Sequence, residues 1–134
     1  MPGKITVPSS HFPKTRRLLK HADFQRVYQN GRRQFTGNMT VFFLRRDPVP
    51  GGMRVGLTVG KVLGGAVERN RIKRRMREAV RVSGVAGPEP VDVVINPRKS
   101  VAGLPFQQLR EEVTRCLRLA LQRAKVAETP ETNV

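Results

Sequence analysis

The segment 68–81, ERNRIKRRMREAVR, sets seven Lys and Arg residues against two Glu residues and keeps apolar residues at helical intervals. At about 100° per residue, one side of a helix would carry the apolar residues Ile72, Met76, Ala79 and Val80. The opposite side would carry Asn70, Lys73, Arg74, Arg77 and Arg81. The pattern therefore predicts an amphipathic helix with a basic outer face.

Short apolar runs on both sides of this helix predict strands. Residues 53–60, MRVGLTVG, alternate in polarity, and residues 91–96, VDVVIN, are apolar enough for a buried strand. If parallel, these strands and the helix form a βαβ unit, for which general rules predict a right-handed crossover. Residues 39–46, MTVFFLRR, predict another strand joined to 53–60 by a turn, and an optional short strand lies around residues 34–38.

Further helices are predicted near both ends of the chain. HADFQRVYQNG, residues 21–31, has apolar residues at i, i+3 and i+4 and a stop at Asn30-Gly31. A final helix begins near Pro105 and carries an apolar stripe that includes Cys116. The predicted fold class is α/β (α+β): a two-layer sandwich of three helices on a small mixed sheet, in the order α-β-β(-β)-α-β-α. The helices would cover one sheet face and leave the other partly open.

The charge of the chain indicates its partner. The 134 residues carry a formal net charge of +16 and a pI near 11.7, which an extended polyanion would compensate while releasing its counterions. We therefore expect a nucleic acid as partner. No run of about 18 apolar residues and no apolar signal-peptide core occur, so no membrane partner is expected and the predicted location is cytoplasmic.

The sequence offers no catalytic or metal-binding constellation of its own. The ten acidic residues are scattered, and His11 and His21 stand alone. Glu111 and Glu112 are adjacent on a helix and point in different directions, which favours a solvated or phosphate-repelling face over a metal-binding pair. The lone Cys116 is predicted to be a core thiol. We expect no protein-bound cofactor.

Two groups of residues are candidate binding sites. On the basic helix, Glu78 can neutralise only near neighbours, so most of the positive charge should bind phosphates, with Asn70 reaching sugars or base edges. The backbone N–H groups near residues 64–67, at the start of this helix, could add a phosphate contact. Spacing alone favours Phe24 and Tyr28 as core residues, although two rings near a basic surface could instead stack unpaired bases.

The sequence resembles the protein subunit of bacterial ribonuclease P from about residue 17 to residue 125. The resemblance rests on RLL…DFQRVYQNG and on RVGLTVGKVLGGAVERNRIKRRMREAVR. It implies that the residues facing the catalytic RNA are Arg69, Asn70, Arg71, Lys73, Arg74 and Arg77. It further implies that Phe24 and Tyr28 contact the single-stranded 5′ leader of precursor tRNA in a cleft beside the first helix.

The same resemblance sets expectations for fold and chemistry. It implies a left-handed βαβ crossover, as in a ribosomal-protein domain, in place of the right-handed one. Hydrolysis would belong to the RNA and its Mg²⁺ ions, with no obligate protein partner. Lys61 is a possible phosphate contact. The chain departs from the family pattern at Val62 and Gly65. It also has Pro97 before Arg98 and Lys99, so no role is carried over to either of these two residues.

The predicted organisation is a flexible basic arm at residues 1–15, one RNA-binding domain at 16–126 and a flexible tail at 127–134. A structural ribosomal protein would share the charge and the small sheet, and remains the alternative. A helix-turn-helix DNA-binding protein fits less well, because strands intervene and no second short helix abuts the basic one.

Overall fold

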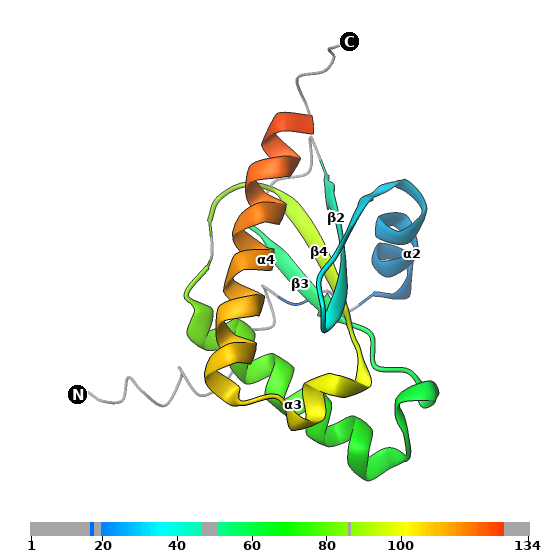
Figure 1. Cartoon of the computed structure of the whole chain (residues 1–134). Coiled ribbons are helices and arrows are strands. Elements are labelled where there is room, and N and C mark those ends of the chain that lie inside the picture. The colour runs from blue at the N-terminus through cyan, green and yellow to red at the C-terminus, as the bar shows by residue number, and fades with distance from the viewer. Residues whose placement is uncertain (1–16, 18–19, 47–50, 86, 128–134) are drawn as a thin grey trace, which may run out of the picture.

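The computed structural model describes residues 17, 20–46, 51–85 and 87–127. The predicted arm at 1–15 lies outside the described residues, as does the predicted tail from residue 128 onward. The described helices and strands follow one another along the chain (Figure 1). They are α2 (His21–Asn30), β1 (Arg32–Phe35), β2 (Met39–Arg45), β3 (Arg54–Leu57), the 3-10 helix η3 (Lys61–Leu63), α3 (Ala66–Ser83), β4 (Val91–Pro97), the 3-10 helix η4 (Lys99–Gly103) and α4 (Phe106–Ala127).

The predicted order of elements is confirmed, including the optional strand. That strand, β1, begins at Arg32, slightly earlier than predicted, and pairs antiparallel with β2. The four strands form one mixed sheet in the order β1-β2-β4-β3, in which β2 and β4 are antiparallel and β3 and β4 are parallel. The parallel pair confirms the predicted βαβ unit, and the hand of its crossover stays a prediction.

The predicted turn between the second and third strands does not make them neighbours. Strand β4 lies between β2 and β3, with Val93 opposite both Phe43 and Val55. Nearly every residue of β4 is buried, since both of its faces are covered. A run that is apolar on both faces belongs in the centre of a sheet, which explains why β4 takes this place.

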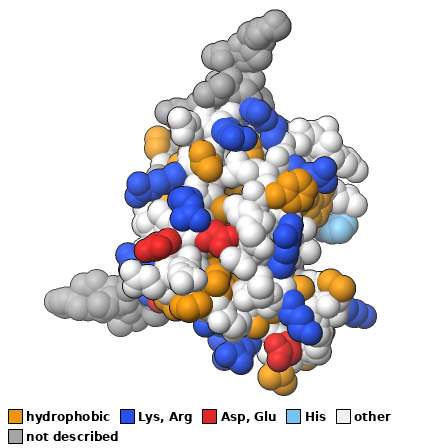
Figure 2. All heavy atoms as spheres, viewed as in Figure 1, with side chains coloured by type: hydrophobic (Ala, Val, Ile, Leu, Met, Phe, Trp, Pro, Cys, Tyr) orange, Lys and Arg blue, Asp and Glu red, His pale blue; other side chains and the backbone are white. Residues whose placement is uncertain are grey.

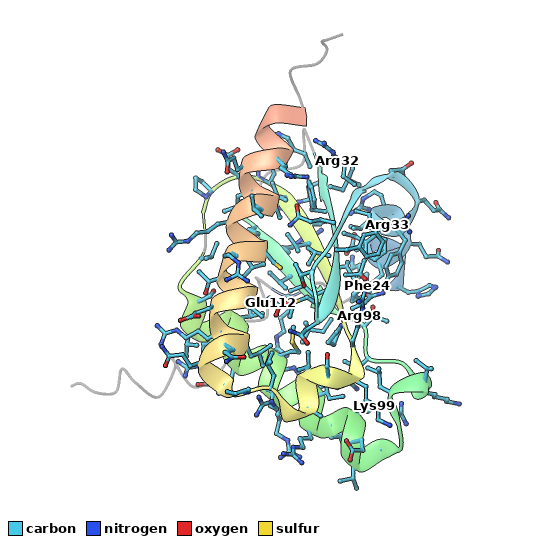
Figure 3. The ribbon with its side chains drawn as sticks, in the orientation of Figure 1. Phe24, Arg32, Arg33, Arg98, Lys99 and Glu112 are labelled. Carbon is cyan, nitrogen blue, oxygen red and sulfur yellow. The ribbon has the colours of Figure 1, made fainter. Side chains whose placement is uncertain are left out.

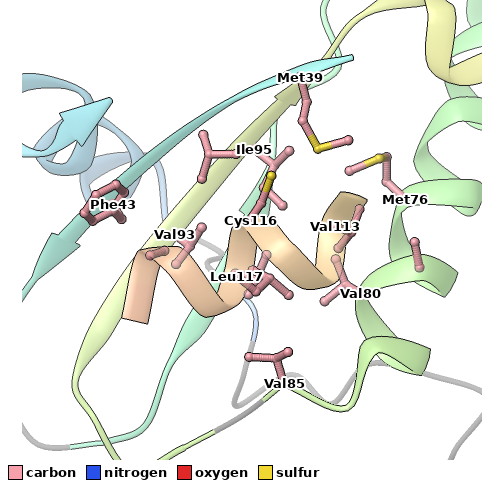
Figure 4. Close-up of a cluster of buried hydrophobic side chains, with 14 of the residues drawn as sticks. Met39, Phe43, Met76, Val80, Val85, Val93, Ile95, Val113, Cys116 and Leu117 are labelled. Carbon is pink, nitrogen blue, oxygen red and sulfur yellow. The ribbon is translucent and has the colours of Figure 1, made fainter. Parts of the chain in front are cut away.

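Helices lie on both faces of the sheet, so the expectation that all helices cover one face is wrong for α2. Helices α3 and α4 form the main core with one face, where Met76, Cys116 and Leu117 meet Ile95 (Figure 4). Helix α2 packs on the opposite face, where Val27 contacts a smaller cluster around Val94 (Figure 1). The short α2 leaves part of this second face uncovered.

Two glycines end the helices that flank the candidate site. A Cβ at Gly31 would lie 2.5 Å from the carbonyl oxygen of Val27 and 2.7 Å from that of Phe43, so only glycine fits at the end of α2. The predicted stop at Asn30-Gly31 is thereby confirmed. Gly84 ends α3 with φ 69°, a left-handed conformation that glycine adopts without steric cost.

Candidate nucleic-acid interface

Helix α3 displays the predicted basic face. Its buried side is formed by Ile72, Met76, Ala79 and Val80, as the spacing predicts. Opposite them, the side chains of Asn70, Arg71, Arg74 and Arg77 are exposed. Lys73 is half-buried at the edge of this basic face, and Arg69 is half-buried on the same side of the helix as Met76 and Val80, with its Nε inaccessible. Figure 2 shows Lys and Arg side chains spread over the whole visible face of the molecule, including the lower part, where α3 lies. The structure thus brings all six predicted RNA-facing residues onto one helix.

Most of the charge on α3 is not neutralised within the helix. Glu78 forms an ion pair with Arg81, and the hydrogen bonds from Arg81 lower the pKa of Glu78. Arg75 is also engaged, because its guanidinium donates to the carbonyl oxygen of Leu104. In the part of the chain that the structure describes, Arg74 and the other exposed arginines of α3 have no ion-pair partner. Their guanidinium groups are free to bind phosphates.

The start of α3 lies beside this face. Lys61 is exposed on η3, and Gly64 connects η3 to α3 with φ 129°. No side chain caps the helix at Gly65, so the first backbone N–H groups of α3 lack a side-chain acceptor. The exposed fractions of Val62 and Val67 are 90% and 83%. Lys61 and the uncapped N–H groups therefore lie at the N-terminal end of α3, where Glu68 is exposed as well.

The second predicted site lies between α2 and the sheet. Phe24 is half-buried against the cluster that includes Phe42 and Val94 (Figure 3). Tyr28 is 36% exposed, and its ring lies edge-on to Phe42 with 4.9 Å between centroids. The Tyr28 hydroxyl lies 2.6 Å from Thr58 Oγ1 and donates to Asn96 Oδ1 at 3.0 Å. The structure therefore holds both rings against the sheet while leaving part of Tyr28 accessible.

A buried ionic network lies on the sheet face that α2 covers. The sequence analysis did not predict it. Asp92 on β4 is fully buried and accepts hydrogen bonds from Arg46 at 2.6 Å, Arg54 at 2.9 and 2.8 Å, and Arg26 at 3.3 Å. Hydrogen bonding to Asp92 raises the pKa of Arg54. Asp23 joins the network through Arg26 at 2.7 Å. The sequence does contain a sign of this network, because an aspartate stands inside the apolar run VDVVIN. A carboxylate in a buried strand requires buried polar or charged partners.

A cleft of about 410 Å³ lies beside this network. Its lining combines cations with one aspartate and one leucine: Lys20, Asp23, Arg26, Leu44, Arg45, Arg46 and Arg54. Basic side chains therefore reach the face that carries Phe24 and Tyr28 as well as the face of α3.

The prediction for Glu112 is wrong. Glu111 is exposed as expected, but Glu112 is 7% exposed and faces the turn between β1 and β2. Its carboxylate accepts hydrogen bonds from the Thr36 hydroxyl, from the backbone N–H of Asn38 at 3.2 Å and from the Asn38 amide at 2.7 Å. Burial raises the pKa of Glu112, but these hydrogen bonds outweigh burial and lower it below its ordinary value. Through these hydrogen bonds, Glu112 connects α4 to the turn between β1 and β2.

The remaining predictions concern chemistry. Among the described residues, no group of three or more His, Cys, Asp and Glu side chains could hold a metal ion. Cys116 is buried, as predicted, and burial raises its pKa to about 11. No described helix is long and apolar enough to cross a membrane. Arg98 and Lys99 are exposed where β4 leads into η4 (Figure 3).

A mixed sheet, a polycationic helix and a cleft lined by basic side chains define a class: small, basic α+β proteins of the nucleic-acid-binding kind. Within that class, the chain belongs to the ribonuclease P protein family, whose sequence model matches residues 12–121. Members of this family are subunits of ribonuclease P, which has its known role in the 5′ maturation of tRNA.

Individual members of the family are similar in sequence to this chain over most of its length. The ribonuclease P protein component of an Exiguobacterium species is 43% identical over 115 residues, which cover 84% of this chain and 93% of that protein. The component from Streptococcus pyogenes is 32% identical over 88% of this chain and 97% of its own length. These relatives favour ribonuclease P over the ribosomal alternative.

Solved structures show the same fold. The ribonuclease P protein of Thermotoga maritima is 30% identical and superimposes with a TM-score of 0.63, covering 75% of this chain and 94% of that chain. The Staphylococcus aureus protein is 31% identical with a TM-score of 0.61, covering 83% of this chain and 96% of that chain. The predicted fold class is confirmed.

Proposed function

We propose that the exposed face of α3 binds the RNA subunit of ribonuclease P, and that the cleft between α2 and the sheet binds the single-stranded 5′ leader of precursor tRNA. The observation that carries this proposal is the unpaired basic face of α3 in a chain of this family. Both sites belong to one compact fold, so a single protein subunit would contact the RNA subunit and the substrate together.

Binding at α3 is supported by charge and by shape. Arg74 and Arg77 lie at i and i+3, so their guanidinium groups project side by side toward one stretch of RNA backbone. Arg71 and Lys73 flank them, and Asn70 adds a donor and an acceptor for sugar hydroxyls. Each phosphate contact releases counterions from the RNA, which gives affinity with little sequence preference.

Leader binding is supported by the way the cleft holds its rings. The Tyr28 hydroxyl is occupied by Thr58 and Asn96, which fixes the ring in place before any ligand arrives. A fixed aromatic ring stacks on a base at little cost in side-chain entropy. Phe24 is half-buried, so it would frame the cleft and offer one ring edge while it stabilises α2.

We assign hydrolysis to the RNA subunit and its Mg²⁺ ions. The described residues include no group of three or more His, Cys, Asp and Glu side chains that could hold a metal ion. The positive field of the protein would offset the repulsion between two polyanions and lower the Mg²⁺ concentration required. The enzyme would act in the cytoplasm, with no obligate protein partner.

A reconstitution experiment tests this division of labour. Release of the 5′ leader is measured with nuclease-free protein alone, with the RNA subunit alone at high and at low Mg²⁺, and with both at low Mg²⁺. We expect cleavage at low Mg²⁺ only when both subunits are present, and cleavage by RNA alone only at high Mg²⁺. RNA-independent cleavage by the protein would overturn the assignment.

A further inference from the structure

Strand β1 forms one edge of the sheet, and its side chains alternate between the two sheet faces. Arg32 points toward α4, because its guanidinium donates to the carbonyl oxygen of Arg123 at 3.4 Å and lies 5.9 Å from the Phe43 ring. The next residue and the third along the strand therefore point the other way. Arg33 and Phe35 thus lie on the same sheet face as α2.

The register of the sheet connects these residues to the proposed leader cleft. Arg33 pairs with Phe42, and Phe35 pairs with Thr40, the residue two positions before Phe42. Phe35 and Phe42 are therefore diagonal neighbours, roughly 7–8 Å apart between Cα atoms. Phe42 in turn contacts the ring of Tyr28. Tyr28, Phe42 and Phe35 therefore follow one another on this sheet face from α2 to the edge strand, with Arg33 beside Phe35.

Phe35 is not explained by packing. It is 60% exposed, more than any other aromatic residue in the part of the chain that the structure describes, and it belongs to neither buried cluster. A large apolar side chain on an open edge strand invites aggregation, and proteins usually avoid it. Its recorded contact is the guanidinium of Arg33, 5.1 Å from the ring centroid. Arg33 covers one face of the ring and leaves the other accessible.

We propose that Phe35 stacks on an unpaired base of the 5′ leader, at a nucleotide different from those that reach Phe24 and Tyr28. A half-covered ring offers one flat apolar face, which suits any base. The cation above the other face holds the ring in position and brings positive charge close to the leader backbone. This inference rests on the proposed leader cleft and extends it across β2 to β1.

The test uses the protein assembled with its RNA subunit. Dissociation constants are measured for mature tRNA and for precursors whose leaders are shortened one nucleotide at a time. The variants are Phe35→Ala, Phe35→Tyr, which keeps an aromatic face, and Phe24→Ala. Leu119→Ala is the matched control, because Leu119 is a 37% exposed apolar residue on α4, away from the cleft.

We expect Phe35→Ala to weaken binding of the long-leader precursor about fivefold or more, which corresponds to the lower end of base–aromatic stacking energies. Binding of mature tRNA should not change, and Phe35→Tyr should bind like the unmodified protein. As the leader is shortened, the effects of Phe35→Ala and Phe24→Ala should disappear at different lengths, because the two rings contact different nucleotides.

The outcomes distinguish a failure of the proposed role of Phe35 from a failure of the proposed leader cleft. If Phe24→Ala discriminates between precursor and mature tRNA but Phe35→Ala behaves like Leu119→Ala, the inference is wrong and the leader cleft stands. Equal losses for precursor and mature tRNA with Phe35→Ala also overturn it. If neither Phe24→Ala nor Phe35→Ala discriminates, the leader cleft itself is wrong, and the role of Phe35 falls with it.

Discussion

Replacing Arg74 and Arg77 together with Ala removes two exposed guanidinium groups from the centre of the basic face on α3. Neither arginine has an ion-pair partner among the described residues, and Ala favours helices, so the fold should not be weakened. If each arginine contacts one phosphate, the double variant loses two released counterions. The salt slope of RNA binding should then fall by about 1.4 to 1.8 units.

This change in slope has a measurable consequence for affinity. Between 50 and 200 mM salt, the affinity gap between the unmodified protein and the double variant should narrow by about tenfold, as follows from that slope difference over a fourfold range of salt. The gap should be largest at low salt, where counterion release drives binding most strongly. A filter-binding or anisotropy titration of the RNA subunit at several salt concentrations measures both quantities.

A matched control separates a local contact from a general loss of charge. Arg110→Ala with Arg118→Ala removes two positive charges as well, from exposed positions on the neighbouring helix α4. If the α3 contacts are local, the α4 double variant should retain nearly the full slope. Equal slope changes in both double variants would refute the assignment of the interface to α3, as would an α3 variant with unchanged slope and affinity.

Phe24→Ala should weaken binding of precursor tRNA about fivefold or more and leave binding of mature tRNA unchanged, provided that circular dichroism shows the variant folded. Asp92→Ala should lower the free energy of unfolding by about 3–5 kcal/mol in chemical denaturation, because the arginines around it lose a buried counter-charge. Glu112 has a lowered pKa when folded, so its stabilisation is present above the ordinary value of 4.5 and is lost as pH falls through the lower folded value. Glu112→Gln should therefore unfold more easily at pH 7 and show a flatter loss of stability in acid.

The helices and the basic face of α3 could be predicted from local sequence patterns alone. The spacing of Ile72, Met76 and Val80 fixes which side of α3 is buried, and this periodicity is a property of the segment alone. The stop at Gly31 is equally local. The order of the strands was harder, because a short turn suggests adjacent strands, whereas β4 pairs with both β2 and β3 from a distance in sequence.

Side chains with distant partners could not be placed from the sequence. Glu112 is bonded to Thr36 and Asn38, which lie 76 and 74 positions earlier in the chain, so its neighbours in sequence gave no sign of burial. The hydroxyl of Tyr28 likewise depends on Thr58 and Asn96. For such residues, the spacing of apolar residues along a helix shows on which face a side chain lies. It does not show which distant segment of the chain packs against that face.

Asp92 shows how stability and binding are joined in this fold. It sits on the α2 face of the central strand, and its arginine partners come from α2, from β3 and from the residue after β2. A buried aspartate with three arginines around it fixes those segments relative to one another, because moving any of them would leave charge uncompensated in the interior. Asp92 therefore holds α2 over the sheet, on the face against which Phe24 and Tyr28 pack. The three arginines that bind Asp92, which are Arg26, Arg46 and Arg54, also line the cleft of about 410 Å³ beside it. The cations that hold α2 in place are therefore among those that a polyanion bound in this cleft would contact.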